Sequence, residues 1–528
     1  MTEQNSTNPS RFPTFRRCVR ILFTRWTLYA LIVLVTLFAL FHAEENFRGQ
    51  RAWDRYRKDA EARGVKFDFA AFIPAPVPDD QNAANNWVVQ SWFPRAQPND
   101  PNWPTLIAEA EQRIASRKNN PDRRATEHFA DLVAMQEAMA DVLSGTKKKG
   151  RNLAEQDRSP QERAQAAVAV LDNLKAYQPA LDELRSTSRR PHVRFPIDYK
   201  LDDPFSILLP HLAKIKGVVQ ELKLQADAEL AAGRVDDAFA DVMFMIWLSD
   251  SMREEPFLID QLVRIACLHI AVQPIWEGLA EHKWTDAQLQ QLQHRLQQFD
   301  FVSDIAAPMN SERAAAVGLI ERLARNRRSR PDINDLFSAG DQPSVQSGSA
   351  VRVASLIPRG WFYFEALNYC TMMDDQMKDG VNYQKKTINA RQVEENHERM
   401  ERSLKDAKGL DLILSHRFFA RLLLPALRNA TRKFAMAQVT ATEGAMACAL
   451  ERYRLANGQF PETLDALAPG FMTSLPHDVL TGEPLKYERG RDGGFVLSSV
   501  GWPTREGKDR PGDWVWHMDP VPTTNHSE

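Results

Sequence analysis

The sequence predicts a mainly α-helical protein with one N-terminal transmembrane helix, an α-helical ectodomain that contains helical hairpins, and a small C-terminal α+β lobe. Three observations support this fold class. Residues 26–41 form an apolar run, which approaches the length of a membrane helix once neighbouring apolar residues are included. Apolar residues recur at three- and four-residue steps through most of the remaining chain. Glycine is scarce, at 23 of 528 residues, whereas residues that favour helices are abundant.

The composition limits the class of protein and its partners. The formal net charge is −2 and 26% of the residues are charged, so no basic field favours nucleic acid and we expect no nucleic-acid partner. Hydrophobic residues make up 43% of the chain, which is enough for a real core. The four cysteines have no short spacing, which excludes a disulfide framework and a C-x-x-C zinc site. One long-range disulfide and buried free thiols both remain open.

Residues 1–20 are expected to be a basic cytoplasmic tail and residues 21–43 a transmembrane anchor. Arginines precede the apolar run, whereas Glu44 and Glu45 follow it, and basic flanks stay on the cytoplasmic side of a membrane. We therefore expect a single-pass protein of a bacterial inner membrane, with a cytoplasmic N-terminus and the bulk of the chain in the periplasm. A cleaved signal peptide is the alternative, although the exit Phe41-His42-Ala43-Glu44 lacks the small-residue pattern that cleavage needs.

The middle of the chain is expected to be largely helical. Residues 44–103 are interpreted as a charged helix and then a connector rich in proline and tryptophan, because closely spaced prolines prevent regular elements. Residues 104–326 form the predicted helical ectodomain. Its clearest feature is a helical hairpin over 214–252 that Gly233 divides. Thr285 is expected to be the N-cap of a later helix.

Two further segments precede the C-terminal lobe. Residues 327–350 lose periodicity and gain Ser, Gly, Pro and Asp, so they are predicted to be a disordered loop. Residues 351–408 are predicted to continue the helical part. Within them, 391–408 are polar on all sides, so this helix is expected to bridge other elements or to project into solvent.

Residues 409–528 are expected to combine a long helix with a small antiparallel sheet. The helical pattern runs from 410 to 457 and is interrupted only by Pro425, and Gly458 ends it in the way that glycine commonly ends helices. The segments PLKYERG and GFVLSSV predict two strands joined by a glycine-containing turn. The segment WVWHM could add a third strand.

This C-terminal part resembles a known family. The segments ALERYRLANGQFPETLDAL, TGEPLKY and GFVLSSVG are similar to the stem helix and C-terminal sheet of bacterial type II secretion pseudopilins, over about 420–517. The resemblance implies a pseudopilin-like long helix packed on a small antiparallel sheet. The major pseudopilin also binds calcium in its last loop. Asp509, Asp513 and Asp519 could supply oxygen ligands, although ordinary solvated loop acids explain the same residues.

The usual catalytic and cofactor-binding motifs are missing from the sequence, which contains no H-E-x-x-H, G-x-S-x-G, G-x-G-x-x-G or phosphate-binding glycine loop. Ser144 and Lys147 match S-x-x-K, but this lysine begins a lysine run in a polar loop, whereas that chemistry needs a buried lysine. His192 and His211 flank acids in 198–203 and would form a site only if they converge in space. We therefore predict no catalytic, cofactor-binding or metal-binding residue, and no cofactor.

Tryptophans gather in two irregular segments. They could form a stacking platform for a sugar polymer, or they could bury their rings as anchors for irregular chain, which is the commoner role of large aromatic side chains. The residues concerned are Trp87, Trp92 and Trp103 in the connector, and Trp502, Trp514 and Trp516 near the C-terminus.

These observations favour a non-enzymatic function. The leading hypothesis is a membrane-anchored envelope scaffold or interaction protein that contacts the lipid bilayer and protein partners in the envelope, with a link to secretion or pilus-type assembly. The alternative is an envelope enzyme or binding protein that acts on cell-wall polysaccharide or peptidoglycan. Such an enzyme needs two acids about 5–10 Å apart in a tryptophan-lined cleft, which a linear sequence cannot show.

Overall fold

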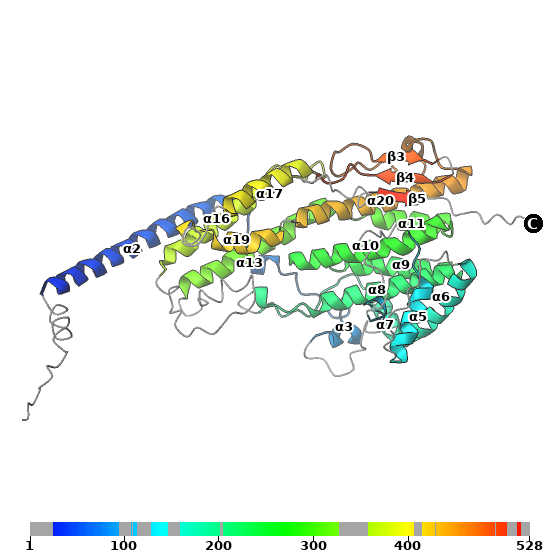
Figure 1. Ribbon diagram of the computed structural model, residues 1–528, viewed down its shortest axis with the longest axis horizontal. Helices are drawn as coiled ribbons and strands as arrows, with labels where there is room; N and C mark the ends of the chain where they lie inside the picture. The colour runs from blue at the N-terminus through cyan, green and yellow to red at the C-terminus, as the bar shows by residue number, and fades with distance from the viewer. Residues whose placement is uncertain are drawn as a thin grey trace, which may run out of the picture. The chain divides into compact units, whose positions relative to one another are not determined.

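The computed structural model is mainly helical, as the sequence predicts, and carries two small sheets (Figure 1). The chain divides into two compact units. Unit 1 comprises 1–65, 319–370 and 408–420, and unit 2 comprises 66–318, 371–407 and 421–528. The predicted basic tail and the predicted loop at 327–350 lie outside the described residues. The structure describes residues 25–93, 107, 109–112, 128–145, 159–200, 204–326, 357–405, 414–427, 429–490, 493–503 and 515–518.

Helix α2 (Arg25–Ala62) is the longest element of unit 1. Its 38 residues form one unbroken helix of roughly 57 Å, so the apolar run and the charged helix that follows it are a single element. The side chains of the apolar half are exposed, Leu34 for example to 64%. An 18-residue window of this helix has a mean hydropathy of 2.0. The N-terminal apolar helix could therefore be a membrane span or a signal sequence.

Unit 1 also holds the last residues of α13 (Ala306–Arg325), the first part of α16 (Arg359–Met377) and the start of α19 (Phe418–Leu427). Helices α2 and α16 touch backbone to backbone at a pair of glycines. A Cβ atom on Gly49 would overlap the backbone of Gly360, and one on Gly360 would overlap the carbonyl group of Glu45. Asn46 Oδ1 accepts a hydrogen bond of 2.8 Å from the Gly360 amide. Only glycine allows this approach.

Buried carboxylates add polar contacts inside unit 1. Glu321 accepts hydrogen bonds from the Trp53 indole at 2.9 Å and from Arg57 at 3.0 Å. Glu365 accepts hydrogen bonds from the backbone amides of Phe418 and Phe419, both at 3.0 Å. Burial raises the pKa of Glu365 to about 7, although these two hydrogen bonds oppose the shift. The carboxylate thereby satisfies amides at the start of α19 that no helical carbonyl can reach.

The centre of unit 2 is a group of long helices, α8 (Pro210–Ala231), α9 (Val235–Asp250), α10 (Leu258–Ala280), α11 (Asp286–Gln297) and α20 (Ala430–Asn457) (Figure 1). The predicted hairpin is confirmed, since Gly233 separates α8 from α9 with a φ of 77°. Thr285 caps α11 through a reciprocal capping box with Gln288. Helix α10 is also apolar enough to span a membrane, but 67% of its most apolar window is buried, as expected of a core helix.

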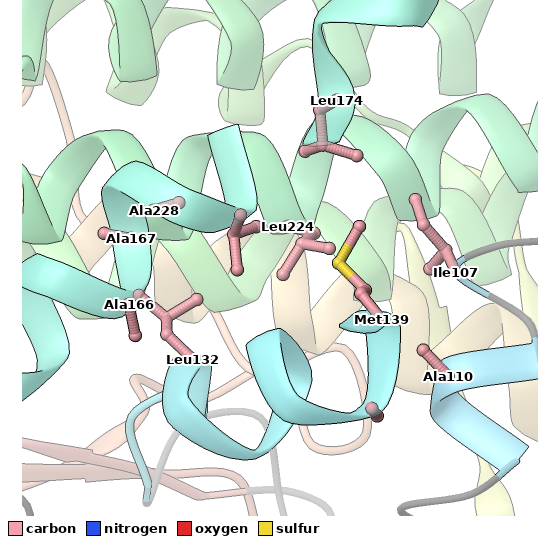
Figure 2. Close-up of a cluster of buried hydrophobic side chains, with 11 residues drawn as sticks. Ile107, Ala110, Leu132, Met139, Ala166, Ala167, Leu174, Leu224 and Ala228 are labelled. Carbon is pink, nitrogen blue, oxygen red and sulfur yellow. The ribbon is translucent and has the colours of Figure 1, made fainter. Parts of the chain in front are cut away.

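Helices α5 (Leu132–Leu143), α6 (Pro160–Leu174) and α7 (Gln178–Thr187) form the neighbouring part of unit 2. Figure 2 shows the apolar cluster that α5 and α6 build with Leu224 and Ala228 of α8. Ser159 begins α6 with a capping box to Glu162. The shorter elements of the unit are η1 (Phe69–Phe72), α3 (Trp87–Ser91), η2 (Lys175–Tyr177), η3 (Pro204–Ser206), α12 (Phe301–Asp304) and η6 (Leu464–Leu467).

The C-terminal sheet confirms the predicted strands and includes the third. Strands β3 (Lys486–Arg489), β4 (Phe495–Ser498) and β5 (Val515–Met518) are antiparallel in the order β3-β4-β5. The predicted long helix consists of two helices, since α19 ends at Leu427 and α20 starts at Ala430. Pro425, where the sequence predicts the interruption, lies inside α19. Gly458 ends α20 with a φ of 79°.

The predicted helical continuation at 351–408 needs two corrections. A two-stranded hairpin, β1 (Val381–Asn382) and β2 (Thr387–Ile388), interrupts it. The helix that follows, α17 (Ala390–Lys405), does not project into solvent on all sides. It buries an apolar stripe of Val393, Met400 and Leu404, which recur at helical spacing among many charged residues.

The glycine contact in unit 1 gives a stability prediction. We expect Gly49→Ala to lower the free energy of unfolding by about 1–3 kcal/mol, because the methyl group forces the two backbones apart. Gly318→Ala in α13 is the matched control. It also replaces a helical glycine, but its Cβ would meet nothing within 4 Å, so it should be neutral or slightly stabilising. Thermal unfolding of the full chain in mild detergent measures both, and equal midpoints would contradict the close-contact account.

Candidate functional site: a polar groove beside the hairpin

Two adjoining pockets of unit 2 form the candidate site, which we call the polar groove. The larger has a volume of about 610 Å³ and the smaller about 380 Å³, and His477 lines both. Lys385 lines the larger pocket and its neighbour Lys386 the smaller. The further lining residues of the larger pocket include Asp379, Asn382, Thr387, Asn389, Thr481 and Glu483. Those of the smaller pocket include Arg253, Gln297, Gln298, Asp300, Gln438 and Thr442.

An apolar cluster lies beneath the groove and holds its walls together. Ile388 of β2, Val393 of α17, Val439 of α20 and Val479 pack together with the buried Trp502. The Ile388 amide also donates a hydrogen bond of 2.7 Å to the Val479 carbonyl oxygen. The hairpin and the turn at 477–483 are therefore fixed to each other by both burial and a backbone bond.

The turn at 477–483 is organised by the buried carboxylate of Asp478. Its Oδ1 accepts a hydrogen bond from the Leu480 amide at 2.9 Å. Its Oδ2 accepts from the Ser499 hydroxyl at 2.9 Å and from the Val500 amide at 3.0 Å. Charge-assisted hydrogen bonds of this kind are stronger than neutral ones. Asp478 thus ties the groove wall to the chain that follows β4.

The hairpin tip connects the groove to α12. Lys386 Nζ lies 2.8 Å from Asp300 Oδ2, and Asp300 caps α12 through the Ser303 amide. Partial burial works against ionisation of Asp300, but the hydrogen bonds from Lys386 and Ser303 outweigh it and lower its pKa. The Lys386 side chain is 58% exposed, so the pair is worth at most about 1 kcal/mol. It positions the tip more than it stabilises the fold.

The groove offers hydrogen-bonding groups and charges of both signs. Amide side chains, hydroxyls, a histidine, lysines and carboxylates line it, and no Phe, Tyr or Trp is among the described residues that line the larger pocket. Such a surface matches a polar ligand with donors, acceptors and charges along its length. The smaller pocket includes the ring of Phe299, but this side chain is only 5% exposed and leaves little surface on which a sugar could stack.

A second set of ionisable groups is buried between α7, α8 and α9. Glu221 is fully buried, and neither of its carboxylate oxygens has a hydrogen-bond partner among the described residues. Burial first, and Asp241 second, raise the pKa of Glu221 to about 9. Burial likewise raises the pKa of Glu229 to about 8. Asp241 pairs with Arg185. Glu221 and Glu229 therefore carry protons at neutral pH.

A third group of buried charges lies on α6, α8 and α10. Lys223 Nζ lies 2.9 Å from Asp227 Oδ2, and Arg163 pairs with Glu277. Burial, with Asp227 next in importance, raises the pKa of Glu277 to about 7, and Arg163 opposes that shift. Both carboxylates are fully buried, so a substrate could not reach them without local opening. The Arg163–Glu277 pair links α6 to α10, whereas the Lys223–Asp227 pair lies within α8.

The histidine and acid constellation near 192–211 is not assembled by the described residues. His211 is fully buried between Phe93 and Phe195, with ring centroids 5.8 and 4.5 Å away. Burial lowers its pKa to about 3, and its nitrogens have no hydrogen-bond partner in the described part of the chain. His192 is exposed. Asp202 and Asp203 lie outside the described residues.

The other sequence candidates do not form sites either. Ser144 is an exposed C-cap of α5, and Lys147 lies outside the described residues. Within the described ranges no group of three or more His, Cys, Asp or Glu could hold a metal ion. The cysteines that the structure describes, Cys267, Cys370 and Cys448, are buried. Asp509, Asp513 and Asp519 fall outside the described ranges.

The tryptophans that the structure describes do not form a stacking platform. Trp92, Trp502 and Trp516 are buried to 5% exposure or less, so their rings pack as anchors for irregular segments. Trp87 is 50% exposed, and Trp103 and Trp514 lie outside the described residues. A sugar-binding surface made of stacked tryptophans is therefore not seen in this part of the chain.

Sequence reasoning missed the groove residues entirely. The segment 379–389 falls in the predicted helical continuation, although the pair Asp379-Gly380 is a turn signal and β-branched Thr387 and Ile388 favour a strand. The charged and amide residues near it looked like an ordinary solvated surface. What makes them a site is the turn at 477–483, almost a hundred residues away, which no local pattern indicates.

Comparison with known proteins gives no indication of function. No protein-family model, no curated protein and no solved structure matches the chain. The resemblance of 420–517 to pseudopilins therefore stays a prediction.

The buried acids predict an inverse dependence of stability on pH. The pKa of Glu221 is about 9 in the folded chain, against an ordinary pKa of 4.5. Between these two pH values the folded state therefore binds more protons than the unfolded state. The free energy of unfolding should fall as pH rises through this window. Glu221→Gln removes the titration, so the variant should exceed the parent chain in stability at pH 8 by on the order of 3–5 kcal/mol.

Denaturant unfolding of both chains at pH 5 and pH 8 measures this difference. Glu488→Gln on the exposed face of β3 is the matched control and should change little at either pH. A Glu221→Gln advantage that is the same at both pH values would contradict the assignment of a buried, protonated Glu221.

Proposed function

We propose that this chain is a membrane-anchored interaction protein whose polar groove holds an extended segment of a protein partner. The observation that carries the proposal is the pair of adjoining pockets that share His477. Two adjoining pockets suit a stretch of polypeptide better than a compact small molecule. Their charges of both signs and their amide groups can pair with peptide bonds and with charged side chains.

The N-terminal helix supports anchoring. The exposed apolar half of α2 has no covering side chains among the described residues, and such a surface needs a lipid or protein environment. The arginines before it and the acids after it favour a cytoplasmic N-terminus. On this proposal the protein is a single-pass protein of a bacterial inner membrane, and the groove faces the periplasm.

The C-terminal lobe supports a role in assembly. A long helix packs against a small antiparallel sheet, which agrees with the arrangement that a pseudopilin-like lobe would have. We therefore propose secretion or pilus-type subunits as the class of partner. A function on wall polysaccharide is less favoured, because no Phe, Tyr or Trp is among the described residues that line the larger pocket, and Phe299 in the smaller pocket is only 5% exposed.

Site-specific photo-crosslinking tests the groove directly. A photo-reactive phenylalanine replaces Asn382 or Thr481, which both line the larger pocket, in the full chain in its native membrane. We expect discrete products in which mass spectrometry finds a segment of one partner protein. The same probe at Val168, which is 63% exposed on α6, should not give them. Products of equal yield from Val168 would contradict a specific groove.

A charge reversal in the groove provides the matched test of specificity. Lys385→Glu should reduce the yield of the groove product about tenfold, which corresponds to about 1.4 kcal/mol of binding free energy. Lys175→Glu, an exposed lysine at the end of α6, should leave the yield unchanged. Thermal unfolding of both variants establishes that the fold is intact. An unchanged yield for Lys385→Glu would argue against electrostatic recognition in the groove.

A further inference from the structure

An aromatic cluster lies in unit 1 beside the end of the apolar half of α2. The Phe41 ring meets the Trp361 ring edge-on, with centroids 6.3 Å apart. The His416 ring lies 5.0 Å from Trp361 and stacks on Phe364 at 5.1 Å. Leu414, two residues before His416, is 57% exposed. We call these five residues the aromatic collar.

Polar and basic groups border the collar. The Trp361 indole donates a hydrogen bond of 3.0 Å to Glu45, and Arg48 pairs with the same glutamate at 2.7 Å. Arg359 donates to Gln50 and is exposed, as is Arg48. Tryptophan and arginine are the side chains that occupy the boundary between hydrocarbon and water, because each has an apolar body and a polar tip.

The helical rise places the collar at the height of the lipid headgroups. Helix α2 continues from its apolar half without a break, so each residue adds about 1.5 Å along its axis. Glu45 lies four residues beyond Phe41, or about 6 Å. A headgroup layer is about 5–8 Å thick on each side of the hydrocarbon core. The contacts to Phe41 and Glu45 hold Trp361 within that range.

We propose that the aromatic collar is a membrane-seating surface, in contact with the headgroup layer of the bilayer that α2 enters. Lipid is the partner that fits, because the collar continues the apolar surface of the span and ends in exposed arginines. Unit 1 would then rest on the membrane and would not stand away from it on a stalk. The inference depends on the proposed membrane anchorage by α2.

Membrane depth of nitroxide labels tests this surface. The full chain with Cys18→Ser, whose other cysteines are buried, carries one new cysteine at Leu414, Val33 or Val168. It is reconstituted in vesicles of phosphatidylcholine and phosphatidylglycerol. Val33 lies in the apolar half of α2, and Val168 is an exposed position on α6. Collisions with oxygen report a lipid environment, and collisions with a water-soluble nickel complex report an aqueous one.

We expect the Leu414→Cys label to be several-fold less accessible to nickel than the Val168→Cys label, and more accessible than the Val33→Cys label. If the label at 414 is as accessible to nickel as the label at 168, while the label at 33 is embedded in lipid, the seating proposal is wrong but α2 is still a membrane anchor. If the label at 33 is itself in water, α2 is not a membrane anchor, and both proposals are wrong.

Discussion

The burial of α20 between helices and sheet is the constraint on which unit 2 depends. A Cβ atom on Gly444 would contact both Leu296 of α11 and Trp516 of β5, so a neighbouring helix and the sheet meet α20 at the same position. Its middle is rich in small buried residues, such as Ala445 and Ala447, which allow neighbouring elements to approach closely. Val439 of the same helix belongs to the apolar cluster beneath the polar groove. Bundle, sheet and groove therefore share one helix.

Much of this architecture could be predicted because it depends on local rules. The hairpin of α8 and α9 follows from apolar periodicity and a glycine at its turn, and the N-cap at Thr285 follows from the residue type at the start of the helical pattern. The strands β3 and β4 follow from alternation and a glycine-rich turn. The apolar run of α2 stands out for the same reason, since a continuous hydrophobic segment needs no partner to be recognised.

The candidate sites could not be predicted because they depend on contacts between distant segments. The groove exists because the tip at Lys386 meets the turn at His477, and neither segment has a distinctive motif. Gly49 and Gly360 look like ordinary glycines until two helices bring them together. Helix α17 looked polar on all sides because a narrow apolar stripe, such as Val393 and Met400, is outnumbered by charged residues. In each case the feature depends on tertiary contacts, which a local sequence pattern does not indicate.

Native-state hydrogen exchange of the full chain tests most directly whether α20 makes the long helices of unit 2 and the C-terminal sheet unfold together. If it does, the amides of α20 and α10 should exchange together in the slowest class, through global unfolding of unit 2. The amides of β4, the central strand, should exchange only slightly faster. Exchange of α20 and β4 orders of magnitude faster than that of α10 would show that the C-terminal part opens as a separate module, and would contradict the account.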